Sequence, residues 1–218
     1  MSDDSHSHDQ PGAWGVDSEA SRIVVDLHEA QRLLAAGDPR AAALRLRHLV
    51  ARPLPSAFEA DARYLLGRAL EESGDRDGMS AEWMAVLRLD AAADRRPWLL
   101  TLEEFEAAAE AALAELPPEN LEQLVNVAIL IADRPSVEMV AGGIDPRVLG
   151  LYHGVPLAAR SASFGAPYAD TIHLFRTNLE RVETTRAALV QRIRLVVLHE
   201  TAHFFGYGEA ALRRMGLA

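Results

Sequence analysis

Residues 195–209 read LVVLHETAHFFGYGE, in which four apolar residues precede two histidines, His199 and His203, four positions apart. On an α-helix, four residues turn the chain by about 400°, so the two imidazoles lie about 40° apart on one face. Both rings can then reach a single ion at the ~2.0–2.1 Å typical of zinc. We therefore predict a helix that begins near Thr184, continues through His203 and ends at Gly206.

The residues around this histidine pair supply the other groups that a zinc hydrolase needs. Glu200 points to the flank of the same face, where it can take a proton from an activated water instead of binding the metal. Zinc held by two histidines needs a third protein ligand and an open position. Glu209 is the only acidic or histidine side chain after the turn at Gly206. We predict His199, His203 and Glu209 as zinc ligands and Glu200 as the general base.

The alternative is a helix that carries ordinary surface histidines. The apolar run 195–198 argues against it, because this run places the histidine pair on a buried helix. A buried histidine or glutamate without a partner is costly. The interpretation as a metal site is therefore the stronger of the two.

The composition excludes several classes of protein. The chain has 218 residues, of which 49% are hydrophobic and 25% charged, as in ordinary globular proteins. Its formal net charge of -10 argues against a nucleic-acid partner, which requires a basic face. No apolar run approaches the ~20 residues of a membrane span. Cysteine is absent, so a metal can be held only by histidine and carboxylate ligands.

The N-terminal residues are polar and acidic, with neither a basic start nor an apolar stretch. They therefore do not form a secretory signal, and we expect a cytoplasmic protein. Pro11, Gly12 and Gly15 interrupt this segment, so we expect residues 1–20 to form a disordered tail.

Residues 21–96 show the apolar spacing of amphipathic helices. One helix is predicted from Ser21 to a turn at Gly37-Asp38, and a second follows up to Val50. The plan recurs from Ala60, with a turn at Gly74-Asp75 and a partner helix after it. The two Gly-Asp pairs are 37 residues apart, close to the 34-residue period of the tetratricopeptide repeat.

The second of these units resembles a tetratricopeptide repeat. The residues that carry this resemblance are Leu66, Gly67, Leu70, Gly74, Met79, Trp83, Val86 and Asp90. Two units are fewer than the three or so that an independent solenoid needs, so we expect them to rely on the rest of the chain. We expect this segment to recruit a protein partner or to restrict access to the cleft. A pair of helical hairpins without repeat ancestry is the alternative.

Residues 97–218 combine helices with short strands. Thr101 and Glu104 form a capping box that opens a helix to about Leu116. Runs rich in β-branched and apolar residues predict three strands, over 124–132, 148–155 and 171–176. With the long final helix, these elements indicate an α+β fold with a small mixed sheet.

The segment from about residue 99 to the C-terminus resembles the bacterial minimal zincin metallopeptidases. Besides HExxHxxGxxE, whose spacing is similar to that of the metzincins, the resemblance is carried by Phe105–Pro117, Asn126–Ile129, Leu149–Leu157 and Ile172–Phe175. It implies a zinc ion bound by His199, His203 and Glu209, where many members carry Asp in place of the Glu. Met215 is interpreted as a packing residue, not as the methionine of a metzincin turn.

Two further features have weaker claims to function. Tyr152 or His153 could stabilise an oxyanion, although packing at a strand end is the simpler role. The strand over 171–176 could be the sheet edge along which an extended substrate aligns, or an ordinary edge.

These observations predict a zinc metallopeptidase that hydrolyses peptide bonds in a peptide or protein substrate. A catalytically silent zincin module, which acts through its helical repeats, is the alternative. A zinc amidase with a non-peptide substrate would use the same residues.

Overall fold

The computed structural model describes residues 13–94, 96–160 and 170–217. The chain divides into two compact units, one comprising Met1–Ala93 with Val140–Gly143 and the other comprising Asp94–Met139 with Ile144–Ala218. The expected disordered tail lies outside the described residues as far as residue 12. Whether the two units correspond to a repeat domain over 21–96 and a zincin domain over 97–218 stays a prediction.

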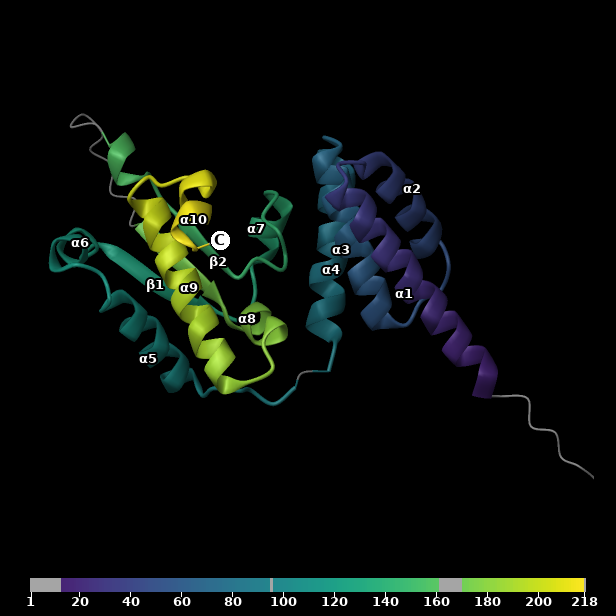
Figure 1. Ribbon diagram of the computed structural model, residues 1–218, viewed down its shortest axis with the longest axis horizontal. Helices are drawn as coiled ribbons and strands as arrows, with labels where there is room; N and C mark the ends of the chain where they lie inside the picture. The colour runs from purple at the N-terminus through teal and green to yellow at the C-terminus, as the bar shows by residue number, and fades with distance from the viewer. Residues whose placement is uncertain (1–12, 95, 161–169, 218) are drawn as a thin grey trace, which may run out of the picture. The chain divides into compact units, whose positions relative to one another are not determined.

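The first unit contains the helices α1 (Ala13–Ala35), α2 (Pro39–Val50), α3 (Ser56–Glu72) and α4 (Arg76–Ala92) (Figure 1). Its two Gly-Asp pairs have the same structural role. Gly37 and Gly74 adopt left-handed φ angles of 76° and 81° at helix ends. Asp38 and Asp75 then cap the next helix, because each carboxylate accepts a main-chain amide hydrogen bond. The repeated dipeptide is therefore a helix-turn-helix signal, and repeat ancestry stays a prediction.

Helix α1 corrects one expectation. It begins at Ala13, eight residues before the predicted start at Ser21, so residues 13–20 are helical and do not belong to a disordered tail. Once a helix is nucleated, each added residue gains a hydrogen bond without a new nucleation cost. A helix can therefore extend beyond its apolar pattern.

Small and large residues interlock in the core of this unit. A Cβ atom at Gly67 of α3 would lie 2.2 Å from the indole of Trp83 on α4, so only glycine permits this approach. Trp83 is 1% exposed, and the helices pack around it through apolar residues such as Ile23 and Leu46. This agrees with the sequence, which predicts small residues where paired helices approach one another.

The second unit contains both helices and strands, as the sequence predicts. Its elements are α5 (Leu102–Leu113), α6 (Pro118–Gln123), β1 (Val127–Ala132), β2 (Gly150–His153), the 3-10 turn η1 (Leu157–Ala159), β3 (Asp170–Phe175), α8 (Arg176–Val182), α9 (Arg186–Phe204) and α10 (Glu209–Met215). The short helix α7 (Val137–Ala141) begins in this unit, and its last two residues belong to the first. The predicted capping box of α5 is present, since Thr101 and Glu104 bond each other's main-chain amides. The short helices α6, α7, α8 and α10 have no counterpart in the sequence prediction.

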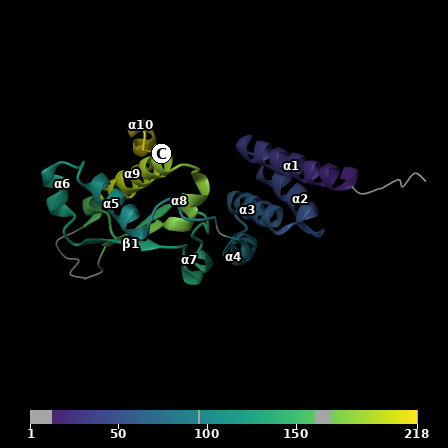
Figure 2. The ribbon, with the colours of Figure 1, turned by 90° about the horizontal axis from the view of Figure 1, so that it is seen from below.

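In the part of the chain that the structure describes, three strands form one mixed sheet in the order β1-β3-β2. Strand β1 is parallel to β3, and β2 is antiparallel to it. Helices α5 and α9 cover one face of this sheet (Figure 2). Ile172 and Leu174 of β3 pack there against Ile193 and Val197 of α9, all at most 1% exposed. The predicted α+β fold class is confirmed.

The sheet order corrects the proposed role of the strand over 171–176. This segment is β3, which lies at the centre of the sheet and pairs on both sides. It cannot align a substrate by edge pairing. Its main-chain groups are already paired with β1 on one side and with β2 on the other. Strand β2 is instead at an edge of the sheet, where it pairs antiparallel with β3.

Two of the predicted strands are shorter in the structure. Strand β1 begins at Val127 and not at 124, because Leu124 ends α6 and its amide bonds the carbonyl of Leu121. Strand β2 covers only Gly150–His153 of the predicted 148–155. Within the described residues, no helix is long and apolar enough to cross a membrane.

Candidate metal centre

Helix α9 carries both histidines and is anchored by its apolar face. Thr185 caps its first turn by accepting a hydrogen bond from the amide of Ala188. Leu189, Ile193 and Val197 are fully buried against the sheet and α5. This packing fixes the rotation of the helix about its axis, and so determines which way the next polar residues point.

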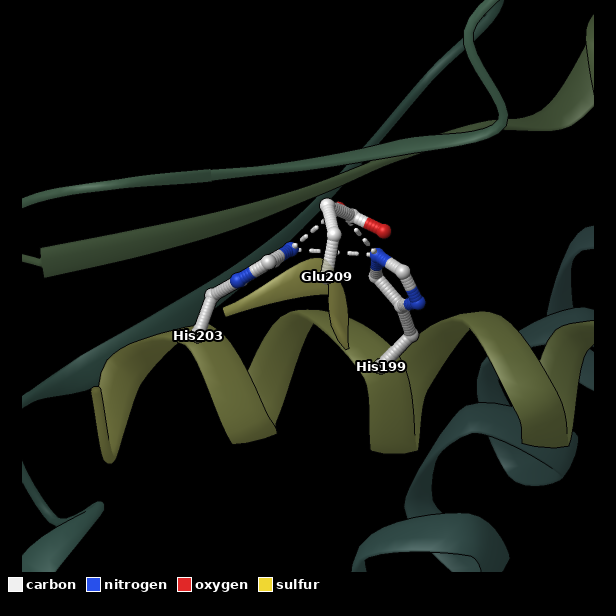
Figure 3. Close-up of side chains that lie close together, drawn as sticks. All are labelled: His199, His203 and Glu209. Atoms are coloured by element: carbon white, nitrogen blue, oxygen red, sulfur yellow. Dashed lines mark hydrogen bonds and ion pairs between the residues drawn. The ribbon is translucent and has the colours of Figure 1, made fainter. Parts of the chain in front are cut away.

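The left-handed turn after α9 returns the chain to the histidines. Gly206 has a φ of 91°, and the amide of Tyr207 bonds the carbonyl of Ala202. This is the Schellman arrangement, in which glycine is preferred because a Cβ atom is disfavoured at positive φ. Three residues later, Glu209 begins α10 on the same side as His199 and His203 (Figure 3).

Three side-chain atoms converge at this place. The Nε2 atoms of His199 and His203 are 3.1 Å apart, and Glu209 Oε1 lies 3.6 Å from the first and 3.3 Å from the second. Four ligands placed tetrahedrally at ~2.0–2.1 Å from zinc are about 3.3–3.4 Å from one another. The three donor atoms therefore have the separations that a zinc site with an open fourth position requires.

The other ring nitrogen of each histidine bonds a main-chain carbonyl. His199 Nδ1 donates to the carbonyl of Leu217 at 2.7 Å, and His203 Nδ1 donates to that of Tyr207 at 2.9 Å. A carbonyl can only accept, so each Nδ1 must carry the proton. In the neutral rings, both Nε2 atoms then present lone pairs, which is the tautomer that binds a metal.

These tautomers leave three acceptors facing one another without a donor between them. Two imidazole lone pairs at 3.1 Å and a carboxylate oxygen repel one another unless a positive charge lies among them. His199 and His203 are only partly exposed, with 21% and 26% of the side chain accessible. The donor set, the separations and the tautomers all fit a divalent metal such as zinc.

Glu200 lies beside these groups and is held by the sheet. Its side chain is buried, and its Oε2 accepts a hydrogen bond from the main-chain amide of Tyr152 at 2.8 Å. Burial raises the pKa of the Glu200 carboxyl above its ordinary value, while the amide of Tyr152 acts in the opposite direction. A raised pKa suits a group that must both accept and return a proton.

Gly150 makes room for this glutamate. A Cβ atom at this position would lie 2.5 Å from Val196 Cγ1 and 3.0 Å from Glu200 Cγ. Real Cβ atoms essentially never make a contact of 2.5 Å, so only glycine lets β2 approach α9 this closely. The sequence analysis did not identify Gly150 as a functional position.

A cleft of about 710 Å³ opens over these residues. Glu200, the two histidines and Glu209 line one part of it, and β2 and the segment around η1 line another. The edge strand β2 therefore borders the cleft. The structure brings together all four residues that the sequence predicts for the site, and their roles as ligands and base stay predictions.

Residues 124–217 match the family model of zincin-like metallopeptidases. The matched segment runs from the end of α6 to the residue after the glycine cap of α10, and it contains the three candidate ligands, Glu200 and the strands β1, β2 and β3. Helices α1 to α4 of the first unit lie outside the matched residues. No curated protein matches the chain.

Tyr152 has a different environment from the one that an oxyanion donor needs. Its hydroxyl donates to Asp170 Oδ1 at 2.8 Å, and the guanidinium of Arg160 binds the other oxygen of this buried carboxylate. Burial and the bond to Asp170 raise the pKa of Tyr152 to about 12. The hydroxyl is thus engaged at the end of β2, which favours the packing role. His153, at the end of the same strand, is exposed.

Sequence reasoning missed three main-chain contributions to the site. They are the amide of Tyr152, which holds Glu200, and the carbonyls of Leu217 and Tyr207, which hold His199 and His203. None of them depends on the side chain of the residue that supplies it. The only available signal was indirect, in the glycines at 150, 206 and 216.

Proposed function

We propose that this protein is a zinc-dependent peptidase in which His199, His203 and Glu209 hold the ion and Glu200 is the general base. The observation that carries this proposal is the convergence of three acceptor atoms, two of them fixed by main-chain carbonyls. The similarity of residues 124–217 to zincin-like metallopeptidases supports it.

A bound zinc ion would supply Lewis acidity, which lowers the pKa of a water from about 15.7 to about 7 and stabilises negative charge on a carbonyl oxygen. Glu200 would accept the proton of the attacking water and pass it to the leaving amine. The amide of Tyr152 holds Glu200 Oε2, which leaves Oε1 for the proton. The burial that raises the pKa of Glu200 strengthens it as a base.

The position of β2 beside the cleft supports an extended peptide as substrate. Strand β2 is an edge of the sheet and borders the cleft beside Glu200. An extended chain can pair with a free strand edge through main-chain hydrogen bonds, whatever its side chains. We expect β2 to have the aligning role that the sequence analysis gave to residues 171–176.

Peptide cleavage by the wild type and by Glu200→Gln tests the proposal. Both proteins are loaded with one equivalent of zinc and incubated with a mixed peptide library, and the products are read by mass spectrometry. Glutamine can still accept the bond from Tyr152, so we expect zinc to be retained and cleavage to slow by roughly 10²–10⁴-fold. Equal cleavage by both proteins would exclude Glu200 as the base.

A zinc-loaded wild type that cleaves no peptide would favour the other candidate functions. Hydrolysis of small non-peptide amides would indicate an amidase. The absence of any hydrolysis would indicate a silent module that acts through a protein partner of the helical unit, which stays a prediction.

A further inference from the structure

Helix α10 meets the candidate metal centre at both of its ends. Glu209 is its first residue and supplies a carboxylate oxygen to the convergent acceptors. Leu217, just after its last turn, supplies the carbonyl that accepts the bond from His199 Nδ1. One short helix therefore contributes both a candidate ligand and the group that orients another.

The carbonyl of Leu217 is placed by a glycine cap. Gly216 has a φ of 72°, and the amide of Leu217 bonds the carbonyl of Leu212 at 3.0 Å. The same geometry occurs after α9, where Gly206 precedes Tyr207 and the carbonyl of Tyr207 holds the other histidine. Each histidine is thus oriented by the residue that follows a left-handed glycine.

Helix α10 is short and mostly exposed. It has seven residues, and Leu212 is the only one of them that is buried. Helices shorter than about 12 residues are marginal on their own in water, so the docking of α10 depends on tertiary contacts. Besides Leu212, those contacts include the two at the metal centre.

We propose that metal binding and the docking of α10 form one coupled event, in which the Leu217 carbonyl is a positioning group for His199. This inference rests on the proposed function, since it requires a metal at the site. When α10 is docked, the Leu217 carbonyl holds the proton on Nδ1 and so keeps Nε2 free for the ion. Glu209 would be attracted to a bound ion, which would keep α10 docked.

Zinc affinity tests the positioning role. The variants are a deletion of residues 217–218 and Gly216→Ala, which strains the cap because alanine disfavours positive φ. Loss of a group that orients a metal ligand typically weakens binding 10–100-fold, and we expect a loss of that size in both variants. Gly74→Ala is the matched control, because Gly74 has the same conformation and the same free space at the end of α3. Its zinc affinity should equal that of the wild type.

Limited trypsin digestion tests the docking directly. Arg213 and Arg214 on α10 are exposed, and cleavage after either releases a short C-terminal peptide that intact-mass spectrometry detects. We expect this cleavage to be at least about tenfold slower with zinc than with a chelator, because cleavage requires the helix to open. Cleavage after the exposed Arg88 on α4 is the internal reference.

The outcomes separate this inference from the proposed function. A wild type that binds no zinc overturns the proposed function and the coupling with it. A wild type that binds zinc, with unchanged affinity in both cap variants and equal trypsin rates with and without zinc, overturns the coupling alone. Weaker zinc binding in both cap variants together with zinc-dependent protection supports it.

Discussion

The main-chain amide of Tyr152 on β2 donates a hydrogen bond of 2.8 Å to the carboxylate of Glu200 on α9. The two residues are 48 positions apart, so only the packing of α9 on the sheet brings them together. The bond fixes one carboxylate oxygen while the side chain is buried. The position of the candidate base therefore depends on how closely β2 approaches α9.

Replacing Gly150 with alanine should disturb this approach. The added Cβ atom would lie 2.5 Å from Val196 Cγ1, so β2 and α9 must separate. We expect a loss of about 1–3 kcal/mol in the free energy of unfolding, measured by urea denaturation. Gly208→Ala is the control, since a Cβ atom there meets nothing within 4 Å, and its effect should stay within about 0.5 kcal/mol. Equal losses in the two variants would contradict the close approach.

Glu209→Ala should weaken zinc binding by more than about 100-fold. Loss of a group that only orients a ligand costs about 10–100-fold in affinity, and loss of a ligand should cost more. The substitution removes one of three convergent acceptors. Competition with a chromophoric chelator measures the affinity, and mass spectrometry measures the metal content. Glu209→Asp keeps the carboxylate and should retain the metal. Glu103→Ala, an exposed carboxylate on α5, is the control. Full zinc binding by Glu209→Ala would remove this residue from the ligand set.

Tyr152→Phe distinguishes a packing role from an oxyanion role. In the wild type, the hydroxyl of Tyr152 donates to Asp170. In the variant, Asp170 would keep the guanidinium of Arg160 as its remaining partner. We expect the variant to lose about 0.5–1.5 kcal/mol of stability, the usual net value of a hydrogen bond. Peptide hydrolysis should fall by less than about tenfold. A loss of about 10²–10³ in kcat with unchanged stability would instead indicate an oxyanion donor.

The stability contributed by Glu104 should depend on pH. The hydrogen bond from Arg186 and that from the amide of Thr101 lower the pKa of Glu104 to about 2. Its unfolded pKa is about 4.3, so its contribution is present in full above that pH and is lost as the pH falls towards 2. We expect Glu104→Gln to lower the urea midpoint at pH 7 and the difference from wild type to shrink at pH 3.5.

This pair is exposed to solvent, so salt should weaken it. Gln can still accept the capping bond from Thr101, which isolates the effect of the charge. A difference in midpoint that stays constant from pH 7 to pH 3.5 would contradict the lowered pKa. Arg186→Gln should reproduce the effect from the other side of the pair.

Local signals predicted much of the fold. The capping box at Thr101 and the Gly-Asp turn at residue 74 are both present where the sequence indicates them. These features depend on residues at most four or five positions apart, so the sequence near them suffices. The start of α1 and the short helix α10 were missed, because neither has a strong apolar period.

The sequence by itself determined which side chains form the candidate centre. His199, Glu200 and His203 share one helix, and Gly206 turns the chain so that Glu209 can return. Helical geometry alone relates these positions, so no distant contact was needed to predict them.

Tertiary structure alone decided how these side chains are oriented. The order of the strands places β2 and not β3 at the edge beside the cleft. The amide of Tyr152 and the carbonyl of Leu217 then hold Glu200 and His199. Every residue but proline carries the same main-chain groups, so the sequence cannot show which amide or carbonyl meets a given side chain. Only the packing of α9 on the sheet and of α10 on α9 selects them.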